Sequence, residues 1–174
     1  MYIDLSKQGW KYRGCFKAKV STQDDWLSSI RWSVVQPKDN QLYAYAFVNN
    51  NNITLFGRSV TLGQHIYLHR YVMALKNNCN YNDVGVVDHK NRNGLDCTRR
   101  NLRIATVQEN MFNRKVRYDS KTGLKNIQIT NGKYLVRVSK DGKSHLLKCD
   151  TQEQAIKERN KLLKKLHGVF ARFE

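Results

Sequence analysis

Residues 86–93 have the sequence Val-Val-Asp-His-Lys-Asn-Arg-Asn, and the interpretation of the whole chain starts from them. The two valines before Asp88 and His89 predict a short buried strand, and residues 102–105, Leu-Arg-Ile-Ala, predict a second strand that returns after a polar loop. Thr106, with Glu109 three residues later, is typical of a capping box at the start of a helix. The stretch therefore predicts a strand, a loop, a strand and a helix in that order.

The net charge favours a polyanionic partner. The 174 residues include 31 Lys and Arg against 14 Asp and Glu, which gives a formal charge of +17. Such an excess repels itself unless a polyanion neutralises it, so we expect nucleic acid. A membrane surface is the competing explanation, but the basic residues are spread through predicted strands, loops and helices and do not gather on one amphipathic face.

Two further features of the sequence bear on compartment and metal class. No run of eighteen apolar residues occurs, and the N-terminus lacks a basic-then-apolar signal segment, so we expect a cytoplasmic protein. Cys15, Cys79, Cys97 and Cys149 are widely spaced without a Cys-x-x-Cys pair. We therefore expect buried or free thiols and no structural zinc.

The N-terminal part predicts a small antiparallel sheet that leads into the central stretch. Residues 31–35, 41–48, 53–56 and 65–68 have strand patterns, and residues 1–20 suggest a strand or hairpin. Residues 21–27 predict a short helix capped by Ser21 or Thr22, and residues 69–75 predict another helix. Among the aromatic residues of the predicted strands, Trp32, Tyr43 and Tyr45 are interpreted as core side chains in preference to DNA contacts.

The C-terminal part predicts three strands and one helix. Residues 123–129, 133–138 and 143–148 have strand patterns, separated by Asn131-Gly132 and Asp141-Gly142, which are strong hairpin turns. Residues 150–153 predict the start of a helix whose apolar residues face a core. Its charged residues, interpreted as a solvent-facing set, are Lys157, Arg159, Lys161, Lys164 and Lys165.

The chain from about residue 66 to residue 113 resembles HNH (His-Me finger, ββα-metal) nucleases of the kind found in phage homing endonucleases. Four segments carry the resemblance, in this order: residues 69–72, 87–90, 101–103 and 109–110, which read His-Arg-Tyr-Val, Val-Asp-His-Lys, Asn-Leu-Arg and Glu-Asn. Each segment is common by itself, and the four together at these spacings are specific. Asp88-His89 alone would be interpreted as a surface turn, and the resemblance favours a catalytic site.

The resemblance implies a role for each of these residues. Asp88 and Asn110 match the positions that bind one Mg²⁺ or Mn²⁺ ion per active site, and His89 matches the general base. Asn101 matches the Asn that bonds across the loop and holds the base in place. Asn113 is a further candidate to assist the metal or the phosphate. Many members have His where this chain has Asn110, and the pair at residues 69–70 is implied to be mainly structural, so His69 stays outside the catalytic set.

Residues 123–173 resemble the plant ethylene-response-factor type of DNA-binding domain, which is also found appended to phage HNH endonucleases. The resemblance rests on Gly-Lys-Tyr-Leu-Val-Arg-Val at residues 132–138 and on residues 166–171. It implies that the three-stranded sheet lies in the major groove of double-stranded DNA. The basic segment 114–122 would then track the DNA. The candidate DNA contacts are Arg114, Lys115, Arg117, Lys125, Gln128, Arg137 and Lys148.

The sequence thus predicts an α+β protein with three parts. Residues 1–113 would form the N-terminal sheet and HNH nuclease domain, 114–122 a basic linker, and 123–174 the three-stranded sheet and helix that bind DNA. The predicted function is a site-specific DNA endonuclease of homing type, acting as a monomer that nicks or a homodimer that cuts both strands, in a bacterial host if phage-encoded. A non-catalytic DNA-binding regulator and an RNA-processing protein are the alternatives.

Overall fold

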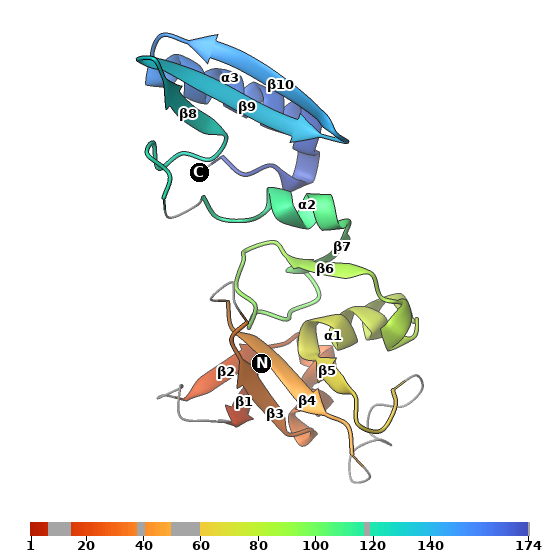
Figure 1. The fold of residues 1–174 in the computed structure, drawn as a ribbon. Helices are drawn as coiled ribbons and strands as arrows, with labels where there is room; N and C mark the ends of the chain where they lie inside the picture. Colours follow the sequence, from red (N-terminus) through yellow and green to blue (C-terminus); the bar gives the residue numbers. More distant parts are fainter. Residues whose placement is uncertain (7–14, 38–40, 50–59, 117–118, 174) are drawn as a thin grey trace. The chain divides into compact units, whose positions relative to one another are not determined.

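The computed structural model describes residues 1–6, 15–37, 41–49, 60–116 and 119–173 (Figure 1). Contacts within the chain divide it into two compact units, Met1–Ala105 and Thr106–Glu174. The three-part division predicted from the sequence stays a prediction. None of the helices among the described residues is long and apolar enough to cross a membrane.

The first unit contains a five-stranded sheet with strand order β2-β1-β3-β4-β5. Its strands are β1 (Tyr2–Ser6), β2 (Phe16–Lys19), β3 (Trp32–Val35), β4 (Tyr43–Phe47) and β5 (His65–Tyr67). The β1–β2, β3–β4 and β4–β5 pairs are antiparallel, as predicted, but β1 and β3 pair in parallel. The antiparallel pairing predicted for the strands at residues 31–35, 41–48 and 65–68 is confirmed. The parallel β1–β3 pair was not predicted, and it forms because the segment after β2 crosses β1 before β3 begins. The predicted strand at residues 53–56 lies outside the described residues.

The connection between β2 and β3 is a 3-10 helix, η1 (Thr22–Ser29), and not the capped helix that the sequence predicted. The Ser21 side chain makes no capping bond, and its Oγ accepts a hydrogen bond from the Arg99 backbone N–H at 3.0 Å. Asp24 leaves helical geometry at φ −109° and ψ 16°, and its side chain is fully buried. The Asp24 carboxylate accepts hydrogen bonds from the distant Arg99 side chain.

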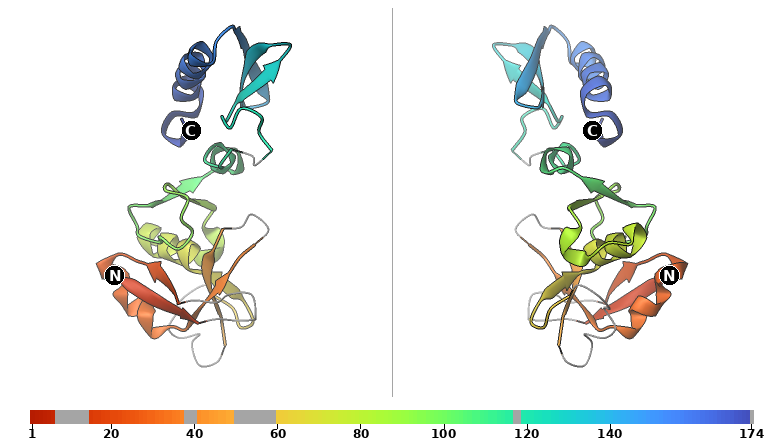
Figure 2. Two further views of the ribbon diagram at one scale, coloured as in Figure 1. Left: turned by 90° about the vertical axis from the view of Figure 1, so that its left-hand side faces the viewer. Right: turned by 90° about the vertical axis from the view of Figure 1, so that its right-hand side faces the viewer.

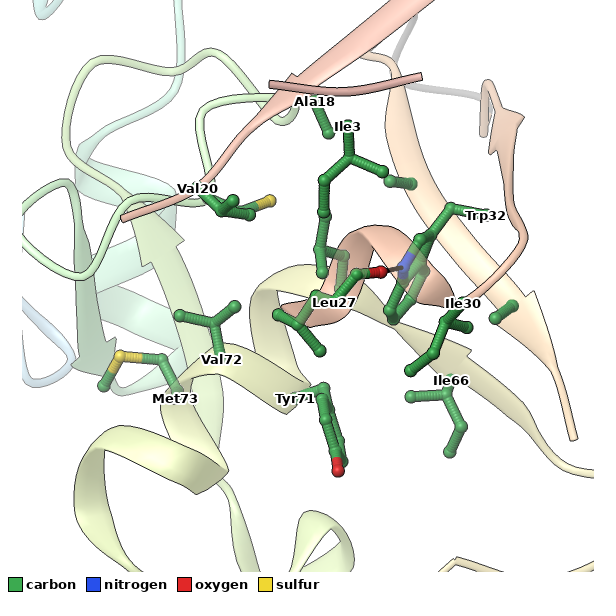
Figure 3. Packing of buried hydrophobic residues seen from close by; sticks show 14 of the residues in the cluster. Ile3, Ala18, Val20, Leu27, Ile30, Trp32, Ile66, Tyr71, Val72 and Met73 are labelled. Atoms are coloured by element: carbon green, nitrogen blue, oxygen red, sulfur yellow. Dashed lines mark hydrogen bonds between the residues drawn. The ribbon is translucent and has the colours of Figure 1, made fainter. Parts of the chain in front are cut away.

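The core of the first unit forms between this sheet, η1 and helix α1 (Leu68–Asn77) (Figure 3). Trp32 is 1% exposed, as predicted for a core residue, and its indole Nε1 donates to the Leu27 carbonyl oxygen at 2.8 Å. Figure 3 shows Ile66, Tyr71 and the Trp32 ring around Leu27. The buried indole N–H is therefore satisfied, as burial of a polar group requires.

Helix α1 contacts both β4–β5 and a separate two-stranded hairpin of the same unit. That hairpin consists of β6 (Val86–His89) and β7 (Leu102–Ala105), and the short 3-10 helix η3 (Tyr81–Asp83) precedes it. The Arg70 guanidinium donates to the Val84 carbonyl at 2.7 Å and lies 5.2 Å from the Tyr81 ring centroid. The predicted strand, loop and strand are confirmed, and Arg70 ties α1 to the segment that leads into β6.

The second unit is a three-stranded antiparallel sheet, order β10-β9-β8, with helix α3 (Gln152–His167) packed on one face (Figure 2). The strands are β8 (Ile127–Thr130), β9 (Lys133–Lys140) and β10 (Lys143–Cys149), preceded by helix α2 (Val107–Phe112) and followed by the 3-10 helix η4 (Gly168–Phe170). Both predicted hairpin turns are confirmed, with φ between 50° and 75° at Asn131-Gly132 and Asp141-Gly142. The Thr151 Oγ1 caps α3 by accepting the Gln154 backbone N–H at 3.2 Å.

One charged residue of α3 lies in the core, although the sequence suggested a solvent-facing position. Arg159 is 1% exposed, and its guanidinium donates to the Lys125 carbonyl at 3.4 Å and the Phe173 carbonyl at 2.9 Å. Burial lowers its pKa from the ordinary value. The interpretation of Arg159 as a surface charge is therefore wrong, because backbone carbonyls from both ends of the unit give the cation its partners.

Candidate active site

Asp88 and His89 end strand β6, where the hairpin pairing fixes them. In the antiparallel register Asp88 lies opposite Arg103 and His89 opposite Leu102. The two side chains are 3% and 4% exposed. Because successive strand residues point to opposite faces, the carboxylate and the imidazole have different surroundings. Two adjacent buried polar side chains are uncommon in a strand and need partners.

The Asp88 carboxylate is held by Arg103 from the neighbouring strand. Both Nε and NH2 of Arg103 lie 2.7 Å from Asp88 Oδ2, and the Arg103 side chain is 15% exposed. A buried carboxylate is tolerated when a well-placed cation and hydrogen bonds compensate its lost hydration. Arg103 was not among the predicted site residues, although alternation within the paired strands could have placed it beside Asp88.

The His89 imidazole lies among other rings. Its centroid is 5.0 Å from the His69 ring and 6.0 Å from the Tyr43 ring. Burial lowers the pKa of His89 from 6.5 to about 4, although the charges of Asp88 and Asp96 oppose the shift. His89 is therefore neutral near pH 7, which is the form that can accept a proton.

Asn101 bonds across the loop between β6 and β7. Its Oδ1 accepts the Asn91 backbone N–H at 3.1 Å, while its Nδ2 donates to the Asp96 carbonyl at 2.7 Å and to Asn91 Oδ1 at 2.9 Å. The Asn101 carbonyl also accepts the Lys90 backbone N–H at 2.9 Å. The loop that follows His89 is thus closed by one buried amide, and the role of Asn101 in holding His89 in place stays a prediction.

A glycine lets this loop lie directly against strand β4. A Cβ atom at Gly94 would collide with the Leu42 carbonyl oxygen and would meet the Tyr43 ring at 3.0 Å. On the same side, Gln41 Nε2 donates to the Arg92 carbonyl at 2.8 Å and Gln41 Oε1 accepts from the Tyr43 hydroxyl at 3.0 Å. The close approach explains why glycine is needed here.

An ion pair ties the other end of the loop to the N-terminal segment. Arg99 Nε donates to both oxygens of Asp24, at 3.1 and 2.9 Å, and Arg99 NH2 donates to Oδ1 at 2.6 Å. Asp24 is fully buried and the Arg99 side chain is 26% exposed. The Asp24 hydrogen bonds raise the pKa of Arg99. This pair, which no local pattern in the sequence predicts, stabilises the loop that ends at Asn101.

His69 lies beside His89, although it was left outside the predicted catalytic set. It is the second residue of α1, and its ring is 5.4 Å from Tyr43 and 5.7 Å from Tyr67. Burial lowers its pKa well below the usual range, and the neighbouring His89 and Arg70 lower it further. The His69 Nδ1 atom is buried and has no hydrogen-bond partner among the described residues. Residues 69 and 89 belong to separate motifs of the sequence, and only the fold brings α1 to the end of β6 and their rings together.

The remaining predicted ligand, Asn110, lies half-buried in α2 of the second unit. The predicted capping box is confirmed, with Thr106 Oγ1 accepting Glu109 N–H at 3.1 Å and Glu109 Oε2 accepting Thr106 N–H at 2.7 Å. Asn113 is 3% exposed and its Oδ1 accepts from Arg172 at 3.0 Å. Asn113 therefore has a structural partner within its own unit.

The C-terminal end of α2 is held by side chains of the second unit. Lys125 Nζ donates to the carbonyls of Met111, Phe112 and Arg114, at 3.3, 2.6 and 2.7 Å. The Phe112 ring stacks on His167 with centroids 3.5 Å apart and planes inclined by 6°. Lys125 was a predicted DNA contact, but in the structure its ammonium group satisfies the last carbonyls of a helix.

The other predicted DNA contacts are distributed as follows. Leu135 of β9 pairs with Gln128 of β8 and with Lys148 of β10. Arg137 is two residues after Leu135 on β9, so Gln128, Arg137 and Lys148 lie on the same face of the sheet. All are exposed, and α3 and the core residues Val136 and Val138 occupy the other face. Arg114 and Lys115 are exposed after α2. A surface pocket beside β8 is lined by Lys115, Gln128 and Arg137, among others. Arg117 lies outside the described residues.

The two predicted metal ligands both carry side-chain oxygen atoms. Among the residues that the structure describes, no group of three or more His, Cys, Asp and Glu side chains could hold a metal ion. Asp88 and Asn110 would supply oxygen atoms, which Mg²⁺ and Mn²⁺ prefer, and such ions commonly complete their shells with water and phosphate oxygens. The four cysteines are free thiols, with Cys15 and Cys79 exposed and Cys97 and Cys149 buried.

A comparison with known proteins found a viral relative of this chain. The chain is 36% identical over 114 residues to an uncharacterized HNH endonuclease of Acanthamoeba polyphaga mimivirus. The aligned region covers 65% of this chain and 59% of the viral protein. No protein-family model matches the chain, and no solved structure matches it significantly. The chain therefore spans about three fifths of the length of the viral protein to which it is similar.

Proposed function

We propose that this protein is a metal-dependent DNA endonuclease of the HNH type, acting at specific sites as homing endonucleases do. The observation that carries the proposal is that Asp88 and His89, two adjacent polar side chains at the end of β6, are both buried. The 36% identity to a protein named HNH endonuclease supports the same class. The charge of +17 suits a DNA substrate.

In the proposed reaction His89 is the general base. A ring nitrogen of His89 takes a proton from a water molecule, whose oxygen attacks the scissile phosphorus while the bond to the 3′ oxygen breaks. Asp88 and Asn110 would hold one Mg²⁺ or Mn²⁺ ion, which when bound neutralises charge on the phosphate and on the leaving oxygen. Asn101 keeps the loop after His89 closed, so that the imidazole holds one orientation.

The exposed face of β8, β9 and β10 is the proposed DNA-binding surface of the second unit. Gln128, Arg137 and Lys148 share this face and are exposed to solvent. Arg and Gln side chains can read base edges in the major groove, whereas Lys commonly contacts phosphate. Arg114 and Lys115 would add phosphate contacts next to α2.

The experiment that tests this function uses genomic DNA of the source organism. Purified protein is incubated with the DNA in Mg²⁺ or in chelator, and new DNA ends are mapped by sequencing. We expect discrete ends that require Mg²⁺, and their presence on one or both strands distinguishes nicking from double-strand cleavage. If the protein binds DNA but produces no ends with any divalent cation, it is a non-catalytic regulator and the endonuclease proposal fails.

A further inference from the structure

A continuous row of aromatic rings covers the outward face of the β4–β5 hairpin in the first unit. The inward residues Ala44, Ala46 and Ile66 are at most 1% exposed. The alternate positions face outward and are half-buried or exposed. These residues, called the ring stripe below, are Tyr43, Tyr45, Phe47, His65 and Tyr67.

Neighbouring rings of the stripe contact one another across the two strands. Tyr45 lies opposite Tyr67, and Phe47 lies opposite His65. The centroid distances are 5.2 Å for Phe47–His65, 5.5 Å for Tyr45–His65 and 6.4 Å for Tyr43–Tyr67. Packing of this kind arranges the rings in sequence along the hairpin.

The ring stripe leads to the proposed catalytic histidine. From Tyr67 the next ring is His69, at 5.7 Å, and the His69 ring is 5.0 Å from His89. Tyr43 contacts both histidines, at 5.4 and 6.0 Å. A ligand that lies along the stripe would therefore end beside the His89 imidazole.

A core function does not account for the outer part of the stripe. The sequence interpretation placed Tyr43 and Tyr45 in the core, but the core of this unit is formed by the opposite face of β4, through Ala44 and Ala46. Phe47 is 48% exposed. Exposed aromatic surface next to a site commonly binds a partner. Tyrosine and histidine, which have polar edges on flat rings, suit a ligand that is itself planar and hydrated.

We propose that the ring stripe binds unstacked bases of the DNA strand that leads to His89. Bases stack on aromatic side chains whatever their identity, and the net charge of +17 attracts the sugar-phosphate backbone that connects them. The inference rests on the proposed nuclease function for the identity of the ligand. It adds to that function a preference for DNA in which bases near the cleavage site are unpaired.

The test measures binding of two single-stranded oligonucleotides of equal length, one with bases and one abasic throughout. The full chain is used in chelator, so that no cleavage occurs. We expect Phe47→Ala and Tyr45→Ala each to weaken binding of the base-containing strand about five- to tenfold, which corresponds to the lower end of the effect of losing one stacked base. Binding of the abasic strand should not change.

Matched variants separate stacking from a folding defect. Phe47→Tyr and Tyr45→Phe retain a ring and should bind both strands as wild type does. Tyr2→Ala removes an aromatic ring that is 59% exposed on β1, outside the stripe, and should also bind as wild type does. If Phe47→Ala does not fold, the fluorescence of 2-aminopurine in the strand bound to wild-type protein is measured instead, because stacking on the rings should quench it.

The outcomes distinguish this inference from the proposed function. The ring stripe is not a base-binding surface if Phe47→Ala and Tyr45→Ala weaken binding of both strands equally, or of neither strand. Unquenched 2-aminopurine fluorescence in the strand bound to wild-type protein would also overturn it. A base-dependent loss in a protein that never cleaves DNA would support the stripe and reject only the endonuclease. If Phe47→Ala weakens the binding of double-stranded DNA by the same factor as the binding of the base-containing single strand, the preference for unpaired bases is contradicted.

Discussion

Removal of the Arg103 side chain tests whether the Asp88 carboxylate binds a divalent cation. Without Arg103 the buried carboxylate loses the cation at 2.7 Å, so we expect Arg103→Ala to lower the free energy of unfolding by about 3 kcal/mol. A divalent cation on Asp88 would compensate part of that loss. We therefore predict that millimolar Mg²⁺ raises the melting temperature of Arg103→Ala more than that of wild type.

Asp88→Asn in the Arg103→Ala background is the control, because its carboxylate is gone and the additional Mg²⁺ effect should disappear. If Mg²⁺ stabilises all three proteins equally, Asp88 does not bind the ion in the free protein. Thermal unfolding in Mg²⁺ and in chelator provides the measurement.

The buried histidines predict how stability depends on pH. His89 has a pKa of about 4 in the folded chain against 6.5 ordinarily, so between these values the unfolded chain takes up a proton that the folded chain refuses. The free energy of unfolding should therefore fall as the pH is lowered from 6.5 to 4, by about 3 kcal/mol for this group. His69, whose pKa is also lowered, contributes in the same direction.

Urea unfolding at several pH values measures this dependence. His89→Gln removes the titrating group, so the slope of stability against pH in this window should be smaller than in wild type, whatever its stability at pH 7. Identical slopes for the two proteins would show that His89 is not kept neutral by burial.

At the level of elements, helix α2 depends on the second unit. Its six residues are too few for a stable isolated helix, and Lys125 satisfies three carbonyls at and after its C-terminal end. We expect Lys125→Met to expose the helix to local unfolding, at a cost of about 2 kcal/mol for the lost charged hydrogen bonds. Hydrogen exchange in the peptide that contains α2 should become faster.

Lys121→Met is the matched control, because Lys121 is an exposed lysine four residues earlier. Exchange in α2 should be unchanged in this variant. The cleavage rate at saturating DNA should fall for Lys125→Met, because α2 contains Asn110, a proposed ligand of the metal ion. Unchanged exchange in Lys125→Met would mean that the helix does not require this lysine.

The elements differ in how well the sequence predicts them, for physical reasons. The β6–β7 hairpin, the capping box of α2 and the two hairpin turns depend on residues close in sequence, and all were predicted. The parallel β1–β3 pair and the Asp24–Arg99 ion pair depend on contacts between distant segments, and neither leaves a local pattern. Arg159 looked like a surface charge because its carbonyl partners, Lys125 and Phe173, come from other segments.

The same distinction applies to the candidate site. Asp88, His89 and Asn101 lie within fourteen residues, so their motif is visible in the sequence, and the loop bonds of Asn101 follow from it. Arg103 pairs with Asp88 within the same hairpin and could have been placed from strand alternation, whereas His69 and the ring stripe come together only when α1, β4 and β5 are in place. Alternation along β4 was visible, but which face meets the core is decided by the packing of Ala44 and Ala46 under α1.

For the whole molecule, the charge of +17 predicts strongly salt-dependent DNA binding. Each phosphate contact contributes a slope of about −0.9 in a plot of log affinity against log salt concentration. We predict that Lys148→Gln lowers the slope by about 1, as expected for one phosphate contact on the exposed face of β10. Lys157→Gln, an exposed position on α3, is the control and should leave the slope nearly unchanged. An unaltered slope for Lys148→Gln would remove this residue from the proposed surface.

The central claim is that His89 performs chemistry on DNA that other parts of the chain bind. It is tested most directly by measuring single-turnover cleavage and equilibrium binding on the same DNA site for wild type and His89→Ala. We predict that cleavage in Mg²⁺ is abolished while the dissociation constant changes less than about threefold, because a general base acts in the transition state and not in the binding of DNA. Cleavage that survives in His89→Ala, or a loss of binding as large as the loss of cleavage, would contradict the assignment of His89 as the general base.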